Sequence, residues 1–156
     1  MFGKKTPEYL AFQRTILVLM AVVGVARLVL SLAGIPDKVV VWFSMNLVGW
    51  AGAFYYGIAG ARAGFTYKQL LPLALYQTVL FHGIAVLGIL LAIAGLPNIY
   101  AAPEYGGGAA TNPWLHVAAH LTLGMVAATL LLWGVSCLVM LVSRRAGRRP
   151  AVAASA

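Results

Sequence analysis

The chain has 156 residues, of which 62% are hydrophobic and only 9% are charged, and its formal net charge is +8. Soluble domains carry about 25% charged residues, so this composition excludes a water-soluble globular protein and predicts one small domain that has the lipid bilayer as its solvent. The positive charges flank apolar runs, which argues against a nucleic-acid partner. A single cysteine, Cys137, excludes an intrachain disulfide and a cysteine-based zinc site.

Four stretches are long and apolar enough to cross a bilayer, which takes about 20 helical residues. They cover residues 13–34, 39–60, 69–95 and 113–142. The first run is too long for a signal peptide, so we expect it to be a retained helix. Asn112 and Pro113 suit the N-cap and the first position of the last helix. The sequence predicts an all-α integral membrane protein, a single four-transmembrane-helix bundle over 1–156, with an outer loop 96–112 and a basic tail 143–156.

The first and third spans end with similar sequences, LSLAGIPD and LAIAGLPN. This similarity could mark a duplicated hairpin. Gly followed by Pro is, however, also a common way to stop a helix. We favour the second interpretation.

Lys and Arg in short loops indicate how a membrane protein is oriented. The outer loop 96–112 has no Lys or Arg, and the loop between the first two spans has only Lys38, beside Asp37. The distribution predicts a multi-pass protein of a bacterial-type inner membrane with both termini cytoplasmic (N-in/C-in). The lipid bilayer is then its first partner. Apart from Arg27 within the first span, the remaining positive residues lie in the two terminal segments and in the loop after the second span: Lys4, Lys5, Arg14, Arg62, Lys68, Arg144, Arg145, Arg148 and Arg149.

Helical periodicity assigns small and polar residues to common faces. Such faces let helix backbones approach closely, so we expect them to point into the bundle. The second span has a stripe of Asn46, Gly49, Ala53, Gly57 and Gly60; the first places Met20, Gly24, Arg27, Ser31 and Gly34 together; the fourth groups His116, His120, Leu123, Ala127 and Gly134.

Counting the helical rise from the span ends places four polar side chains in the outer third of the bilayer. They are Arg27, Asn46, His116 and His120, and Glu104 lies in the loop above them. We therefore expect one polar pocket, with loop 96–112 as a lid. The same count puts His82 deeper, roughly 19 Å from the outer surface.

This pocket suits a binding or accessory membrane subunit that holds a lipid, a quinone-like ligand or a partner subunit, which could be a membrane protein or a second copy of the chain. The alternative is a histidine-based metal or haem redox protein. Two histidines four residues apart suit a divalent metal, with Glu104, in preference to His82, as the third ligand. A haem held by His82 and His120 is disfavoured by a depth difference of about 9 Å.

No nucleophile–base pair, phosphate-binding loop or redox dithiol is present, so the sequence assigns no enzyme activity. Arg27 is costly at a span centre, about 2.5–3.5 kcal/mol on insertion scales. Its role is either structural or the recognition of an anionic ligand group. Neither reading requires a cofactor, and we expect none.

The charge distribution predicts the outcome of labelling from the two sides of the membrane. A cysteine introduced at Gly107 should react with an impermeant label added from the periplasmic side, because loop 96–112 carries no positive residue. A cysteine at Gly147 should react only after the cytoplasmic side is opened. The reverse pattern would contradict the predicted orientation.

Overall fold

The computed structural model describes residues 1–102 and 112–147, and these residues form helices and turns with no strand. Four helical units are long and apolar enough to cross a membrane, as the sequence predicts. The fourth unit contains α6, the π-helical turn η2 and α7 in direct succession. The elements are α1 (Thr6–Leu32), α2 (Asp37–Val40), α3 (Met45–Arg62), α4 (Tyr67–Ile93), α6 (Pro113–Ala119), η2 (His120–Gly124) and α7 (Met125–Gly147).

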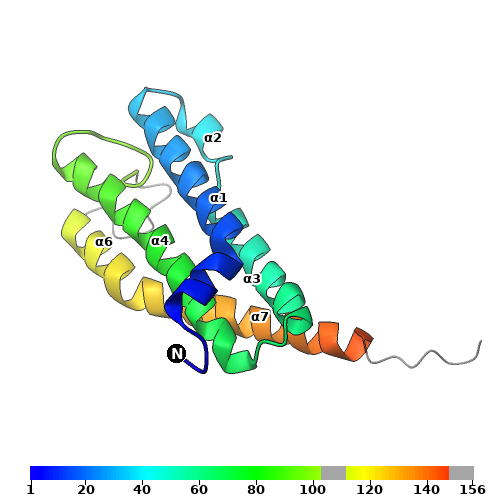
Figure 1. Ribbon diagram of the computed structural model, residues 1–156. Coiled ribbons are helices and arrows are strands. Elements are labelled where there is room, and N and C mark those ends of the chain that lie inside the picture. The colour runs from blue at the N-terminus through cyan, green and yellow to red at the C-terminus, as the bar shows by residue number, and fades with distance from the viewer. Residues whose placement is uncertain (103–111, 148–156) are drawn as a thin grey trace, which may run out of the picture.

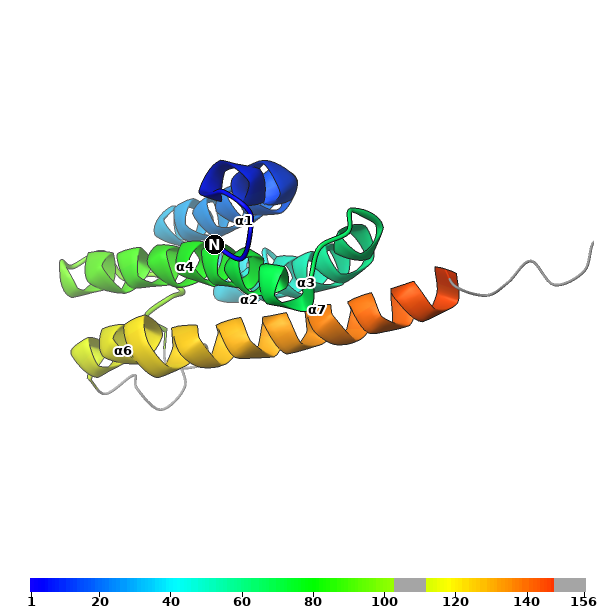
Figure 2. The ribbon, with the colours of Figure 1, turned by 60° about the horizontal axis from the view of Figure 1, so that its bottom comes forward.

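The helices α3 and α4 lie between α1 on one side and α7 on the other, as Figure 2 shows. In the middle of the bundle, α4 packs against α1, α3 and α7. It buries polar residues as well as apolar ones, including Gln77, Thr78 and His82. We call the end where α1 and α4 stop and α3 and α6 begin the α6 end.

Three element boundaries differ from the prediction. The second span is broken, because the chain turns between α2 and α3 and Ser44 caps α3 by accepting a hydrogen bond from Leu47 N–H at 3.4 Å. Serine favours such caps because its hydroxyl competes with helical hydrogen bonds. The first helix begins at Thr6, well before residue 13. The last helix continues to Gly147, so the expected basic tail from residue 143 is helical at its start.

The similar sequences at the ends of α1 and α4 form the same helix stop. Gly34 and Gly95 adopt φ of 78° and 92°, where glycine has no steric penalty. The next residue in each case bonds back to the helix, from Ile35 N–H to Leu30 O at 3.1 Å and from Leu96 N–H to Leu91 O at 2.9 Å. The loop after α3 has the same arrangement at Gly64. A motif that recurs on a third helix supports the helix-stop interpretation over a duplicated hairpin.

The predicted small-residue stripe of α3 is a packing face, since Gly49, Ala53, Gly57 and Gly60 are all buried. Gly57 lies directly against α7. Asn46, the first member of the predicted stripe, is exposed. The stripe therefore joins α3 to its neighbours over most of its length and opens at the α6 end.

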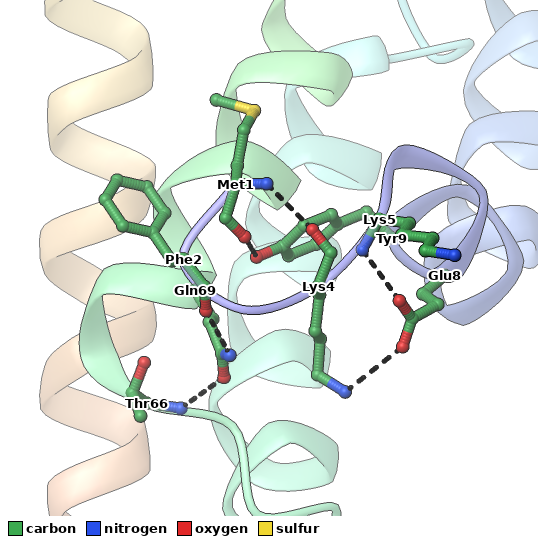
Figure 3. Close-up of polar contacts among 8 residues, drawn as sticks. All are labelled: Met1, Phe2, Lys4, Lys5, Glu8, Tyr9, Thr66 and Gln69. Carbon is green, nitrogen blue, oxygen red and sulfur yellow. Dashed lines mark hydrogen bonds and ion pairs between the residues drawn. The ribbon is translucent and has the colours of Figure 1, made fainter.

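The opposite end of the bundle is tied together by the N-terminal residues, as Figure 3 shows. Gln69 of α4 donates from Nε2 to Phe2 O at 2.7 Å and accepts from Thr66 N–H at 2.8 Å. Tyr9 donates to Met1 O at 2.9 Å. These bonds hold the start of α1 against the start of α4.

The close approach at Gly57 predicts a cost for even one methyl group. A Cβ there would lie 2.6 Å from Val139 Cβ and 2.8 Å from Ser136 O. Because a backbone carbonyl cannot turn away, Gly57→Ala should lower the melting temperature in detergent, in line with the 1–3 kcal/mol typical of overpacking. Gly134→Ala is the matched control, because a Cβ at that position meets nothing within 4 Å. Equal melting curves for the two variants would mean that the α3–α7 contact is looser than the structure has it.

Candidate functional site

The four span residues predicted to form a pocket line one small cavity at the α6 end. Arg27 from α1, Asn46 from α3, His116 from α6 and His120 from η2 surround a space of about 90 Å³. Such a space holds a few waters at roughly 30 Å³ each and is too small for a lipid or a quinone ring. The fifth predicted residue, Glu104, lies outside the described residues.

Arg27 lies against Tyr100, a residue that the sequence analysis did not single out. The guanidinium carbon is 5.4 Å from the centre of the Tyr100 ring, a cation–π contact. Burial raises the pKa of the Tyr100 hydroxyl to about 12, so the hydroxyl keeps its proton and donates to Gly24 O at 3.0 Å. Arg27 Nε is buried and has no hydrogen-bond partner among the described residues.

The start of the predicted outer loop folds into the bundle between α1 and α4. Asn98 donates from Nδ2 to Gly88 O at 2.7 Å, and Ile99 N–H donates to Ser31 Oγ at 2.8 Å. Tyr100 packs on Gly88, where an added Cβ would lie 2.5 Å from its ring. This part of the loop 96–112, which was expected to be a lid, therefore lies between the helices at the α6 end, and its residues 103–111 lie outside the described residues.

The three histidines are joined in a chain. His82 Nδ1 of α4 lies 2.7 Å from His120 Nδ1, and His120 Nε2 lies 3.2 Å from His116 Nε2. The expected depth difference between His82 and His120 is therefore wrong. The two depths were calculated on the assumption that the outer ends of the third and fourth spans lie at the same height. In the structure, α4 projects beyond the start of α6 (Figure 1).

The π-helical turn η2 changes which residues of the fourth span face inward. A π turn takes more residues per turn than an α-helix, so the straight helical face predicted from His116 to Gly134 does not hold. Leu123, expected on that face, is 80% exposed. The inward residues after the turn include Thr129, whose hydroxyl lies 2.6 Å from the Thr78 hydroxyl of α4. Such π turns often occur at functional sites.

A larger cavity of about 210 Å³ lies beside the small one, between α3, α4 and α7. Its polar side chains come mainly from α4, and the rest of its lining is mostly apolar. Among the described residues, two side chains that line it each carry a buried polar atom with no hydrogen-bond partner, namely His82 Nε2 and Gln77 Oε1. The residues that line it are Met20, Met45, Asn46, Gly49, Trp50, Gln77, Thr78, Phe81, His82, Ala128, Leu131 and Leu132.

This cavity opens to the outside of the bundle between α3 and α7, where its rim residues Trp50 and Leu131 are 40% and 55% exposed. It shares Met45, Asn46 and Phe81 with the small cavity, so the two are neighbours. Sequence reasoning missed it because it treated His82 as an isolated deep residue. A signal was present, since Thr78 and His82 lie four residues apart on one face of α4.

The histidine geometry describes hydrogen bonds better than metal ligation. Among residues 1–102 and 112–147, no three side chains of His, Cys, Asp or Glu are placed to hold one metal ion. His120 faces its two neighbours with different ring nitrogens, so the three rings do not converge on a point. A haem iron between His82 and His120 would need their 2.7 Å contact to open, because each nitrogen–metal bond is about 2 Å long.

Comparisons of the chain with protein-family models, with curated proteins and with solved structures find no match.

Proposed function

We propose that the protein is a multi-pass membrane subunit that binds a lipid-soluble ligand with a quinone-like ring in the larger cavity. The observation that carries the proposal is His82, which lines a mostly apolar chamber and whose buried Nε2 has no hydrogen-bond partner among the described residues. An unpaired polar atom in such surroundings costs free energy. A ligand that brings one polar group to this atom removes the cost.

The size of the cavity supports a single ring. An engineered apolar cavity of about 150 Å³ binds benzene, and this one measures about 210 Å³. A quinone carbonyl can accept a hydrogen bond from a protonated His82 Nε2, and a quinol hydroxyl can donate to the unprotonated atom. The ring faces would lie among Met45, Phe81 and Trp50, which line the same space.

The opening between α3 and α7 supports entry from the bilayer. Trp50 and Leu131 at the rim are exposed along the sides of the helices, where acyl chains would lie if the four helices span a membrane. The apolar tail of a quinone-like ligand could remain in the lipid there while its ring enters. We propose further that the membrane is a bacterial-type inner membrane and that both termini are cytoplasmic, as the positive residues favour.

Decyl-ubiquinone titrated into the protein in lipid nanodiscs should quench tryptophan fluorescence saturably, because Trp50 lines the cavity. His82→Leu should weaken this binding about tenfold, since one buried hydrogen bond is worth roughly 1–3 kcal/mol and 1.4 kcal/mol is a factor of ten. Gly134→Ala, in open space on α7, is the control and should bind as the unmodified protein does. Melting curves report whether each variant is folded.

Two further experiments distinguish a quinone-like ligand in this cavity from an acyl chain and from a ligand bound elsewhere. Decylcyclohexane has a ring and a tail but no carbonyl, so it should not displace decyl-ubiquinone; equal competition would indicate a site for acyl chains and overturn the proposal. Trp50→Phe should remove most of the saturable quenching. Undiminished quenching in that variant would place the ligand elsewhere on the protein.

A further inference from the structure

The chain contains three histidines, and all three belong to one hydrogen-bonded series. His82 lines the larger cavity, whereas His116 and His120 line the small one. His82 and His116 are 5% and 7% exposed, and His120 between them is partly buried. The series therefore connects two separate cavities through imidazole rings alone.

Each neutral imidazole ring carries one N–H. The two nitrogen–nitrogen contacts therefore allow only two ways to place the hydrogens on the nitrogens of the three rings. In the first arrangement the hydrogens are on His82 Nδ1, His120 Nε2 and His116 Nδ1. In the second they are on His82 Nε2, His120 Nδ1 and His116 Nε2. Every hydrogen bond in the series reverses its direction between the two arrangements, since His120 must donate from one nitrogen while it accepts at the other.

The structure assigns to His82, His120 and His116 the role of a proton relay between the ligand cavity and the small cavity. A proton that arrives at His82 Nε2 in the first arrangement lets His82 pass its Nδ1 proton to His120 Nδ1. His120 then passes its Nε2 proton to His116 Nε2, and His116 releases its Nδ1 proton. One proton enters and one leaves, and the series ends in the second arrangement. The same steps run backward for transfer in the other direction.

The two ends of the series suit this role. His82 lines the larger cavity and its Nε2 makes no hydrogen bond among the described residues, so this nitrogen, and not Nδ1, is the one left for proton exchange with a ligand. At the other end, the small cavity of about 90 Å³ has room for water beside His116. Proton pathways inside membrane-protein bundles usually consist of a series of ionisable side chains.

Arg27 is the one charged side chain among the described residues that line the two cavities. It lines the small cavity together with His116 and His120, and its guanidinium lies over Tyr100.

Nitrogen-15 NMR of histidine-labelled protein in lipid bilayers tests the relay without any ligand. Couplings across both hydrogen bonds and exchange between the two tautomers of each ring are expected. The fraction with hydrogen on Nε2 should be equal for His82 and His116, and it should match the fraction on Nδ1 of His120 at every temperature. Unequal fractions, or one fixed tautomer for each ring, would overturn the relay.

Variants separate the relay from a merely structural series. His116→Leu should change the tautomer fractions of His82, although the two rings do not bond to each other. Ser136→Ala is the control, because this buried hydroxyl bonds only to Leu132 O of its own helix, and it should leave all three fractions unchanged. Unchanged His82 fractions in His116→Leu would mean that the rings are not coupled. If that variant does not fold, the equality of fractions in the unmodified protein still decides the matter.

Use of the relay by the ligand rests on the proposed function. Decyl-ubiquinone can only accept from His82, so saturating amounts should shift all three rings toward the second arrangement. If the tautomer fractions exchange and are equal but do not change when decyl-ubiquinone is added, the relay stands and the proposed quinone-like ligand is wrong. If decyl-ubiquinone binds but each ring keeps one fixed tautomer, the proposed ligand stands and the relay is wrong.

Discussion

The pairing of polar groups among apolar helices is the constraint on which this bundle depends. Helices that span a bilayer have little hydrophobic drive to associate, so close packing and hydrogen bonds would hold these four together if they span one. α4 supplies most of the bonds at the centre: Gln77 donates to Gly49 O of α3 at 2.9 Å, Thr78 meets Thr129 of α7, and His82 meets His120 of η2. A helix with these side chains is stable only between its neighbours, which explains why α4 lies in the middle.

Glycine makes these bonds possible by letting backbones come close. Gln77 reaches the carbonyl of Gly49 and lies over Gly52, where a Cβ would collide with its amide. At Gly57, α3 lies against the backbone of α7. The same bundle becomes looser toward the α6 end, where Asn46 is exposed and the two cavities open beside it. Close helix packing at Gly52 and Gly57 therefore lies next to polar side chains that surround two cavities.

The site is completed by residues that leave regular helical geometry. Residues 98–100 fold between α1 and α4 and bring Tyr100 beneath Arg27. The π turn changes the rotation of the fourth span about its axis. As a result, His116 and His120 face α4 at the start of the span, and Thr129 faces α4 after the turn. Both features close polar contacts that straight helices would leave unpaired in an apolar environment.

The sequence by itself determined the number of long apolar helices, the glycine stops after α1 and α4, the packing face of α3, and the grouping of Arg27, Asn46, His116 and His120. These follow from local rules of hydropathy, helical period and glycine backbone freedom. Only the tertiary structure decided that His82 meets His120, that Tyr100 lies over Gly88, and that the larger cavity opens between α3 and α7. The relative height of two helices and the extra residue of a π turn depend on contacts between segments that are distant in the sequence. Counting residues along one helix gives no information about those contacts.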